Sequence, residues 1–340
     1  MTKIAHLIEP VGLGGVIRNL ETLTRHMRGV THVHFEVTPR KSLPPVIPAD
    51  HLVVIHFTAS WSKLPYLAAL RAMRGTAPIV IVEHSYTRAY EQLAVRSQPR
   101  FRAMLKLIYS CADRVVAVSH GQAAWLRQAG VVDPAKLAVI PSSTDCGDFE
   151  RLSPPARTGA GGGALRIASC GRYCEAKGFG NLIEAMRALP DGVATLTLAG
   201  LGATEARLKA LAAGMGNVTI GGPTRDVAGL FAACDVVAMP SLFESFGQVA
   251  LEGRAAARPL IASAVDGLIE QTRPEWGWLV EAGDIAGLAN AIQLAASADL
   301  HAMGLAARRS AAGHLEASIA AWHALAAGLM PANAMRRSAA

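Results

Sequence analysis

The stretch Met239-Pro-Ser-Leu-Phe-Glu-Ser-Phe-Gly-Gln-Val-Ala-Leu-Glu252 joins a short apolar strand to a helix through a polar loop. We expect the strand to end at Pro240 and the helix to begin at Gly247. The first N–H groups of a helix have no partner within it, and they lie at the positive end of its dipole. The sequence therefore predicts an α/β unit whose helix N-terminus can hold a phosphate at the carboxyl end of a strand.

The same strand–helix order recurs along the chain and predicts an α/β protein with two doubly wound parallel sheets. Strands are expected over residues 4–8, 52–57, 79–83 and 115–119, and again over 165–170, 195–199, 218–220, 236–239 and 260–262. Residues 153–163, Ser-Pro-Pro-Ala-Arg-Thr-Gly-Ala-Gly-Gly-Gly, suit neither helix nor strand. We therefore predict a Rossmann-like domain over 1–152, a linker over 153–163 and a second Rossmann-like domain over 164–312, with a ligand-binding cleft between them.

Composition indicates a globular protein. Of 340 residues, 51% are hydrophobic and 17% are charged, which excludes a disordered or fibrous chain. The apolar runs are strand-length, shorter than the roughly 18 residues of a membrane span, and the first residues lack the apolar core of a signal peptide. We therefore expect a cytoplasmic protein. Five scattered cysteines without a CxxC pair predict free thiols, with no disulfide framework and no metal site.

The net charge of +7 is concentrated in the first half, where residues 1–150 hold 17 Lys or Arg against 11 Asp or Glu. This excess suggests an anionic partner. The basic segment 88–114 also carries apolar residues at helical spacing. It can make peripheral contact with an anionic membrane, or it can be an ordinary helix with a solvated basic edge. Aromatic residues make up 5% of the chain and do not interleave with the cations, so we expect no nucleic acid partner.

Two carboxylates in the quoted stretch, Glu244 and Glu252, stand eight residues apart. Both can border one pocket and accept hydrogen bonds from vicinal hydroxyls, which makes a sugar and a ribose natural ligands. A plainer explanation has Glu244 capping the helix and Glu252 on a solvated face. The stretch by itself leaves both explanations open.

A second polar loop, Cys170-Gly-Arg-Tyr-Cys-Glu-Ala-Lys-Gly-Phe-Gly180, follows the first strand of the second domain. Arg172 offers a planar fork of donors and Lys177 a compact charge, while Gly171 and Gly178 allow close backbone approach. These cations are candidates for holding a diphosphate. Alone, the segment fits a solvated surface loop as well.

Near the N-terminus, Gly12-Leu-Gly-Gly15 follows the first expected strand. Ile17 replaces the third glycine of a dinucleotide fingerprint, and no acidic residue follows at the expected distance, which disfavours hydride transfer. Gly14 and Gly15 either bring the loop close to a donor phosphate or form a plain tight turn. His84 ends the strand over 79–83 and so points to the expected cleft, although a lone histidine is more often structural.

In this order, these pieces resemble the retaining nucleotide-sugar glycosyltransferases of the GT-B fold, specifically glycosyltransferase family 4, also called glycosyl transferases group 1. The resemblance covers nearly the whole chain. It rests on Gly14-Gly15, His84, Val118-Ser119, Val139-Ile140-Pro141 with Asp145, Gly171-Arg172 with Lys177-Gly178, Leu198-Ala-Gly-Leu-Gly202, Ala233-Cys-Asp235, and Pro240-Ser241 with Glu244-Ser-Phe-Gly247 through Glu252.

The resemblance implies transfer of a hexose from UDP or GDP to a glycan or lipid-linked acceptor in cell-envelope polysaccharide biosynthesis, without a required metal or other cofactor. It implies that His84 and Glu244 are catalytic. The implied donor-binding residues are Gly14, Gly15, Arg172, Lys177, Glu244, Ser245, Phe246, Gly247 and Glu252. It also implies a helix over 313–330 that crosses back to the first domain. A polar tail over 331–340 is expected to follow. The basic segment 88–114 leaves open a peripheral location of the cytoplasmic protein at the inner face of the plasma membrane.

The chain departs from the family pattern in places. It reads Pro141-Ser-Ser-Thr-Asp145 where Pro-Asn-Gly-Val-Asp is usual, and Glu252-Gly-Arg254 where Glu-Ala-Met is common. Two other functions stay open: a nucleotide-sugar epimerase on the same scaffold, and a non-catalytic nucleotide- or nucleic-acid-binding protein. The intact set of Arg172, Lys177, Glu244 and Glu252 favours transfer.

Overall fold

The computed structural model describes residues 2–10, 14–159 and 163–330. Contacts divide the chain into two units: unit 1 comprises Met1–Ser143 with His314–Ala340, and unit 2 comprises Thr144–Gly313. The first boundary falls before the predicted linker at 153–163, and the last helix is counted with the N-terminal residues.

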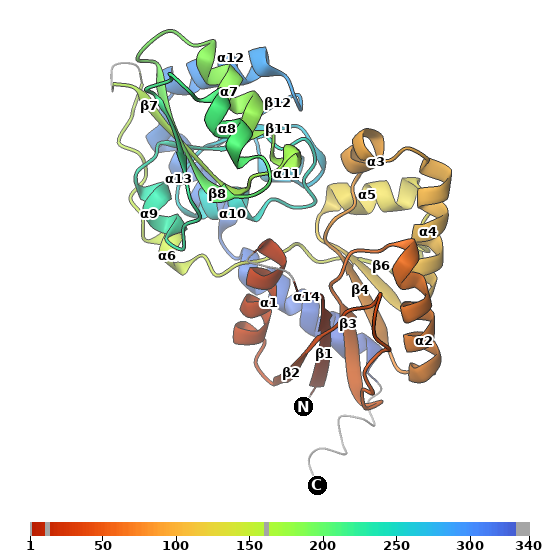
Figure 1. The fold of residues 1–340 in the computed structure, drawn as a ribbon. Helices are drawn as coiled ribbons and strands as arrows, with labels where there is room; N and C mark the ends of the chain where they lie inside the picture. The colour runs from red at the N-terminus through yellow and green to blue at the C-terminus, as the bar shows by residue number, and fades with distance from the viewer. Residues whose placement is uncertain (1, 11–13, 160–162, 331–340) are drawn as a thin grey trace. The chain divides into compact units, whose positions relative to one another are not determined.

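Unit 1 is built on a parallel sheet with the order β2-β1-β3-β4-β5-β6 among its described residues (Figure 1). Its strands are β1 (Thr2–Ile8), β2 (Val30–Glu36), β3 (His51–Ile55), β4 (Ile79–Glu83), β5 (Arg114–Ala117) and β6 (Leu137–Val139). Its α-helices are α1 (Gly15–His26), α2 (Leu64–Arg74), α3 (Arg88–Ala94), α4 (Gln98–Ser110), α5 (His120–Gln128) and α14 (His314–Leu329). The helices supply the crossovers that parallel strands require.

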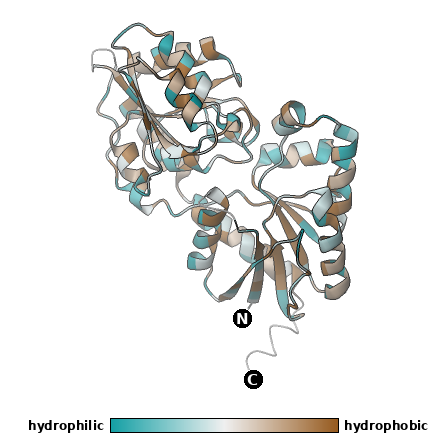
Figure 2. Cartoon of the chain, viewed as in Figure 1, coloured by the Kyte–Doolittle hydropathy of each residue, from teal (hydrophilic) through white to brown (hydrophobic). Residues whose placement is uncertain are grey.

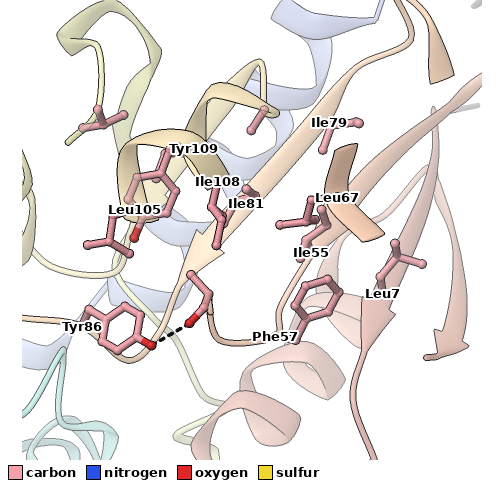
Figure 3. Close-up of a cluster of buried hydrophobic side chains, with 14 of the residues drawn as sticks. Leu7, Ile55, Phe57, Leu67, Ile79, Ile81, Tyr86, Leu105, Ile108 and Tyr109 are labelled. Atoms are coloured by element: carbon pink, nitrogen blue, oxygen red, sulfur yellow. Dashed lines mark hydrogen bonds between the residues drawn. The ribbon is translucent and has the colours of Figure 1, made fainter. Parts of the chain in front are cut away.

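Alternate residues of these strands face opposite sides of the sheet. One side forms a large apolar core, in which β-strand residues such as Leu7, Ile55 and Ile81 pack with Leu67 of α2 and Leu105 of α4 (Figure 3). Within this core the Tyr86 hydroxyl donates a hydrogen bond to the Ala59 carbonyl at 2.6 Å, which satisfies a buried polar group. This packing holds the carboxyl ends of β3 and β4 in place.

Unit 2 has a parallel sheet with the order β12-β11-β10-β7-β8-β9 in the part of the chain that is described. Its strands are β7 (Leu165–Arg172), β8 (Ala194–Leu201), β9 (Val218–Gly221), β10 (Val236–Met239), β11 (Leu260–Ser263) and β12 (Gly277–Val280). Its α-helices are α6 (Gly147–Glu150), α7 (Phe179–Arg187), α8 (Glu205–Leu211), α9 (Val227–Ala232), α10 (Gln248–Ala255), α11 (Asp266–Gln271), α12 (Ile285–Ser297) and α13 (Leu300–Ala311). Strand order reverses at the β10–β7 pair, where ligands bind in such sheets.

Hydrophobic residues are concentrated along the strands of both sheets (Figure 2). The prediction of an α/β fold with two parallel sheets is confirmed. β2 is a strand that the sequence analysis does not predict. It is an edge strand with three apolar residues among four polar ones, in neither a continuous apolar run nor a strict alternation. The basic segment 88–114 contains two helices, α3 and α4, with Pro99 in the first turn of α4.

Candidate active site

In unit 2, the loop after β7 is locked against the loop after β10. Gly178 has a φ of +61°, and a Cβ placed there would lie 1.9 Å from the Pro240 carbonyl oxygen. The Leu242 N–H also donates to the Ala176 carbonyl at 2.8 Å. A residue with a side chain at 178 would force the loops apart, so the predicted glycine is required for a close approach.

This close approach joins two of the predicted site residues directly. The Lys177 ammonium lies 2.5 Å from the Glu244 carboxylate, and the Ser241 hydroxyl donates to the same carboxylate oxygen at 3.3 Å. The two side chains of the ion pair keep 25% and 14% of their surface exposed, so the pair remains open to a ligand. Arg172, at the end of β7, is exposed. The sequence indicated each charge but not the pairing of Lys177 with Glu244.

The residues between Glu244 and α10 are held by α11. Gln271 donates from Nε2 to the Phe246 carbonyl at 2.5 Å and to the Gly247 carbonyl at 3.0 Å. Gly247, with a φ of +90°, precedes the first residue of α10. A Cβ at Gly267 would lie 2.4 Å from the Ser245 carbonyl oxygen. The predicted segment from Ser245 to Gly247 is therefore fixed by residues for which the sequence carried no signal.

Arg254 supports this arrangement from within α10. Its guanidinium donates to the Gln271 side-chain oxygen at 3.0 Å and to the Ser310 carbonyl at 3.0 Å. Burial lowers the pKa of Arg254 to about 10. Arg254, which departs from the family pattern, is thus a buried cation that orients the Gln271 side chain. Gln271 in turn holds the Phe246 and Gly247 carbonyls.

Glu252 is fully buried on α10. Burial and, to a smaller extent, the nearby Glu252 carboxylate raise the pKa of the Cys146 thiol to about 12. Cys146 stands at the start of α6, which packs on α10. The structure therefore rejects the solvated-face explanation of Glu252.

Gly14 and Gly15 lie where α1 begins in unit 1. Gly14 is the residue before the helix, with an extended backbone, and Gly15 is the first helical residue. The Asn19 side chain donates to the Ser143 carbonyl at 3.2 Å and so ties α1 to the loop after β6. Gly12, the first glycine of the predicted motif, lies outside the described residues.

His84 follows β4 directly and is partly buried. Its Nε2 lies 3.2 Å from Nδ1 of His56, a residue for which the sequence showed no motif. Burial lowers the pKa of His84 to about 4, so its imidazole is neutral at pH 7. The neighbouring Glu83 is buried, and its carboxylate accepts hydrogen bonds from the Tyr109 hydroxyl and the Ser85 N–H.

The basic segment packs its apolar residues inward. Met104, Leu105 and Ile108 of α4 are buried, whereas Leu107 is 47% exposed. Arg102 pairs with the buried Glu91 of α3 at 2.6 Å. Within the described ranges, no helix combines the length and apolar character needed to cross a membrane.

Two regions of the chain match known families. Residues 14–147 match Glycosyltransferase Family 4, and residues 164–297 match Glycosyl transferases group 1. A protein of Arthrobacter named D-inositol 3-phosphate glycosyltransferase is 31% identical over 274 residues, which cover 72% of this chain and 65% of the relative. A protein of the same name from Segniliparus rotundus is 34% identical over 172 residues, or 46% of this chain and 38% of the relative. The chain thus spans less than two thirds of these relatives' length.

Solved structures share the fold over nearly the whole chain. A glycosyltransferase from Rickettsia africae has a TM-score of 0.74 and 19% identity, covering 97% of this chain and 99% of that one. HepE of Anabaena, crystallised with UDP and glucose, has a TM-score of 0.73 and 18% identity, with the same coverage. At these identities the likeness concerns the fold.

Proposed function

The chain belongs to glycosyltransferase family 4 and has the GT-B fold, and from that premise we propose that it transfers a sugar from a nucleoside diphosphate to an acceptor hydroxyl with retention of configuration. One observation carries the proposal. In unit 2 a partly exposed ion pair of Lys177 and Glu244 lies at the junction of two strand-end loops, beside the loop that leads into α10.

The donor diphosphate is assigned to Arg172, Lys177 and the N-terminus of α10. A bound diphosphate carries more negative charge than one carboxylate and is therefore a stronger partner for Lys177. The diphosphate also accepts hydrogen bonds from the backbone N–H groups at Gly247 and in the first turn of α10. Glu244, released from Lys177, is then available for hydroxyls of the transferred sugar. The cognate donor is proposed to be a UDP-sugar, a choice supported by the UDP bound in HepE.

Glu252 is assigned to the ribose, with one condition. Because its side chain is fully buried, a ribose reaches its carboxylate only if the residues packed on α10 move. Cys146 at the start of α6 is one such neighbour. Donor binding is therefore expected to displace the segment that begins unit 2.

Catalysis is assigned to positioning and to stabilisation of the leaving group. The C1–O bond to the diphosphate breaks, a bond from C1 to the acceptor oxygen forms on the same face, and the acceptor proton passes to the departing diphosphate. His84 contacts the reacting sugar as a neutral imidazole, and Gly14 and Gly15 lie against the donor phosphates or the acceptor. No metal or other cofactor is assigned a step.

The acceptor is proposed to be a glycan or lipid-linked hydroxyl of the cell envelope, reached at the inner face of the membrane. Exposed cations on α3 and α4 and the exposed Leu107 supply the chemistry of a peripheral contact with anionic lipid. The names of the curated relatives add inositol phosphate as an acceptor for trial.

Donor binding is tested first, by the melting temperature of the protein with UDP, GDP, ADP and their hexose conjugates. A ligand at about 100 times its Kd stabilises the folded state by about 2.7 kcal/mol, so the cognate donor is expected to raise the melting temperature by several degrees. Arg172→Ala should remove most of this shift. Arg151→Ala is the matched control, because Arg151 is 79% exposed and its ion-pair partner among the described residues is Asp148.

Two results would contradict the proposal. One is no shift with any nucleotide. The other is an Arg172→Ala protein that keeps the full shift. With the cognate donor known, release of nucleoside diphosphate in the presence of inositol phosphate or polyprenyl-linked sugar identifies the acceptor, and the anomeric proton coupling of the product reports retention.

A further inference from the structure

Four histidines of unit 1 lie on one face of the sheet, one for each of four adjacent strands. His32 is on β2, His6 on β1, His56 directly follows β3, and His84 directly follows β4. The strand order β2-β1-β3-β4 is the order of these residues in space. Registers Ile4↔His32, His6↔Val54 and Val54↔Val80 place the four histidines on a diagonal toward the carboxyl ends, all on the same side of the pleat.

Hydrogen bonds join the four rings into one chain, which we call the histidine chain. His32 Nδ1 lies 2.9 Å from His6 Nε2, His6 Nδ1 lies 3.0 Å from His56 Nε2, and His56 Nδ1 lies 3.2 Å from His84 Nε2. Each contact therefore pairs an Nδ1 with an Nε2. Ring centroids of successive members are 5.2, 5.2 and 5.5 Å apart.

All four rings are neutral near pH 7. Burial lowers the pKa of His6 and of His56 well below 6.5, and it lowers the pKa of His32 and of His84 to about 4. A neutral imidazole has one N–H and one lone pair. Every hydrogen bond of the chain thus needs a donor nitrogen on one ring and a bare nitrogen on the next.

This requirement leaves two states for the whole chain. If His84 donates from Nε2, then His56, His6 and His32 must each be protonated on Nε2 as well. If His32 donates from Nδ1, then all four rings must be protonated on Nδ1. A mixture of the two leaves two N–H groups or two lone pairs facing each other, which costs a buried hydrogen bond.

Neighbouring rings do not interrupt the chain. His34 of β2 meets His6 edge to face, with centroids 5.3 Å apart, and its Nε2 bonds to the Thr24 hydroxyl of α1 at 3.2 Å. His32 Nε2, at the far end, is buried and has no hydrogen-bond partner among the described residues. Ile4 and Val54, which share this face of the sheet, are buried apolar residues.

We propose that His32, His6 and His56 are positioning residues that fix the tautomer and the ring orientation of His84. The inference rests on the proposed function, in which His84 contacts the reacting sugar. The tautomer decides whether His84 Nδ1 is a hydrogen-bond donor or an acceptor. A sugar-binding site that requires a donor at Nδ1 does not function with an acceptor there, and the reverse also holds. His84 acts as one end of a chain that spans four strands.

The test combines nitrogen NMR with kinetics on the full chain. Two-bond proton–nitrogen spectra of the ¹⁵N-histidine-labelled protein distinguish Nδ1–H from Nε2–H rings. All four rings are expected to share one tautomer. His6→Phe should give His84 a mixed tautomer signal and lower kcat for transfer on the order of tenfold with little change in KM, by analogy with the loss seen when the hydrogen-bond partners of metal-ligating histidines are removed.

Three further variants make the test independent of folding defects and of the mere removal of a ring. His32→Phe alters the edge strand at the far end and should also change the His84 signal. His34→Phe is the matched control, because His34 touches His6 but takes no part in the bond chain; it should leave the His84 signal and kcat unchanged. His6→Gln, which can donate and accept, should recover part of the loss.

The two proposals fail separately. Opposite tautomers within the four rings, or a His84 signal unchanged in both His6→Phe and His32→Phe, overturn the histidine chain even if sugar transfer is observed. One shared tautomer that both variants disturb supports the chain even if no nucleotide binds, and absent donor binding then counts against the proposed function alone.

Discussion

Gly178 and Gly192 both adopt a left-handed backbone, but they differ in surroundings. A Cβ at Gly178 would lie 1.9 Å from the Pro240 carbonyl oxygen, whereas a Cβ at Gly192 would meet nothing within 4 Å. We expect Gly192→Ala to lower the free energy of unfolding by about 1–2 kcal/mol through backbone strain. Gly178→Ala should cost about 3 kcal/mol or more, because overpacking adds to the strain, and should abolish the donor-induced thermal shift.

Urea unfolding of the two variants measures this difference. Two results would contradict this expectation: equal losses of stability in the two variants, or retained donor binding in Gly178→Ala. Either would show that the close approach of the loops after β7 and β10 contributes little to stability or to donor binding beyond the strain of the backbone angle.

Individual site residues were predictable to different degrees. Glu244, Lys177 and Gly178 follow strand ends, and their residue types signal a ligand site. The Lys177–Glu244 pairing was not predictable, because it depends on how two loops distant in sequence pack. Gln271 and three members of the histidine chain, His32, His6 and His56, have no local motif. Only strand register and helix packing bring them to their partners.

At the scale of the element, α14 is hydrogen-bonded to the segment that follows β6 in unit 1. Its Ser318 hydroxyl donates to the Pro141 carbonyl at 3.0 Å, and His314 Nε2 lies 2.9 Å from the Ser142 carbonyl oxygen. Trp322 is 4% exposed, whereas Trp61 of the same unit is 40% exposed. We expect Trp322→Ala to destabilise unit 1 by about 3–5 kcal/mol, because it leaves a cavity.

Trp61→Ala is the matched control and should cost under about 1 kcal/mol. Chemical denaturation followed by circular dichroism measures both. A Trp322→Ala protein as stable as Trp61→Ala would mean that α14 contributes little to the unit with which it is counted.

Elements were more predictable where their pattern is continuous. Buried strands such as β4 and β10 are unbroken apolar runs, which short strand patterns reveal. β2 is not predictable in this way, because it is an edge strand with no fully buried residue and no continuous apolar run. The division of segment 88–114 into α3 and α4 depends on Ser97 and Pro99 at the start of α4, a signal that the basic charge of the segment obscured.

Over the whole molecule, shifted pKa values set the pH range of stability. Histidines whose pKa is lowered by burial are in unit 1, where His32 and His84 titrate near 4. In the unfolded chain they titrate near 6.5. At the alkaline end, burial raises the pKa of Cys146 and of Cys234 in unit 2 to about 12, so the unfolded chain loses these protons first and stability falls as pH rises above about 9.

We therefore expect an acid limit set by unit 1. Between about pH 6.5 and 4, the unfolded chain binds protons that the folded chain excludes, so the free energy of unfolding falls as pH is lowered. Each histidine that stays neutral contributes up to about 1.4 kcal/mol per pH unit. Urea unfolding at pH 7, 6 and 5 measures the slope, and His32→Phe should reduce it because one excluded proton is removed. Stability that is constant or rises toward pH 5 would mean that the folded histidine chain accepts protons.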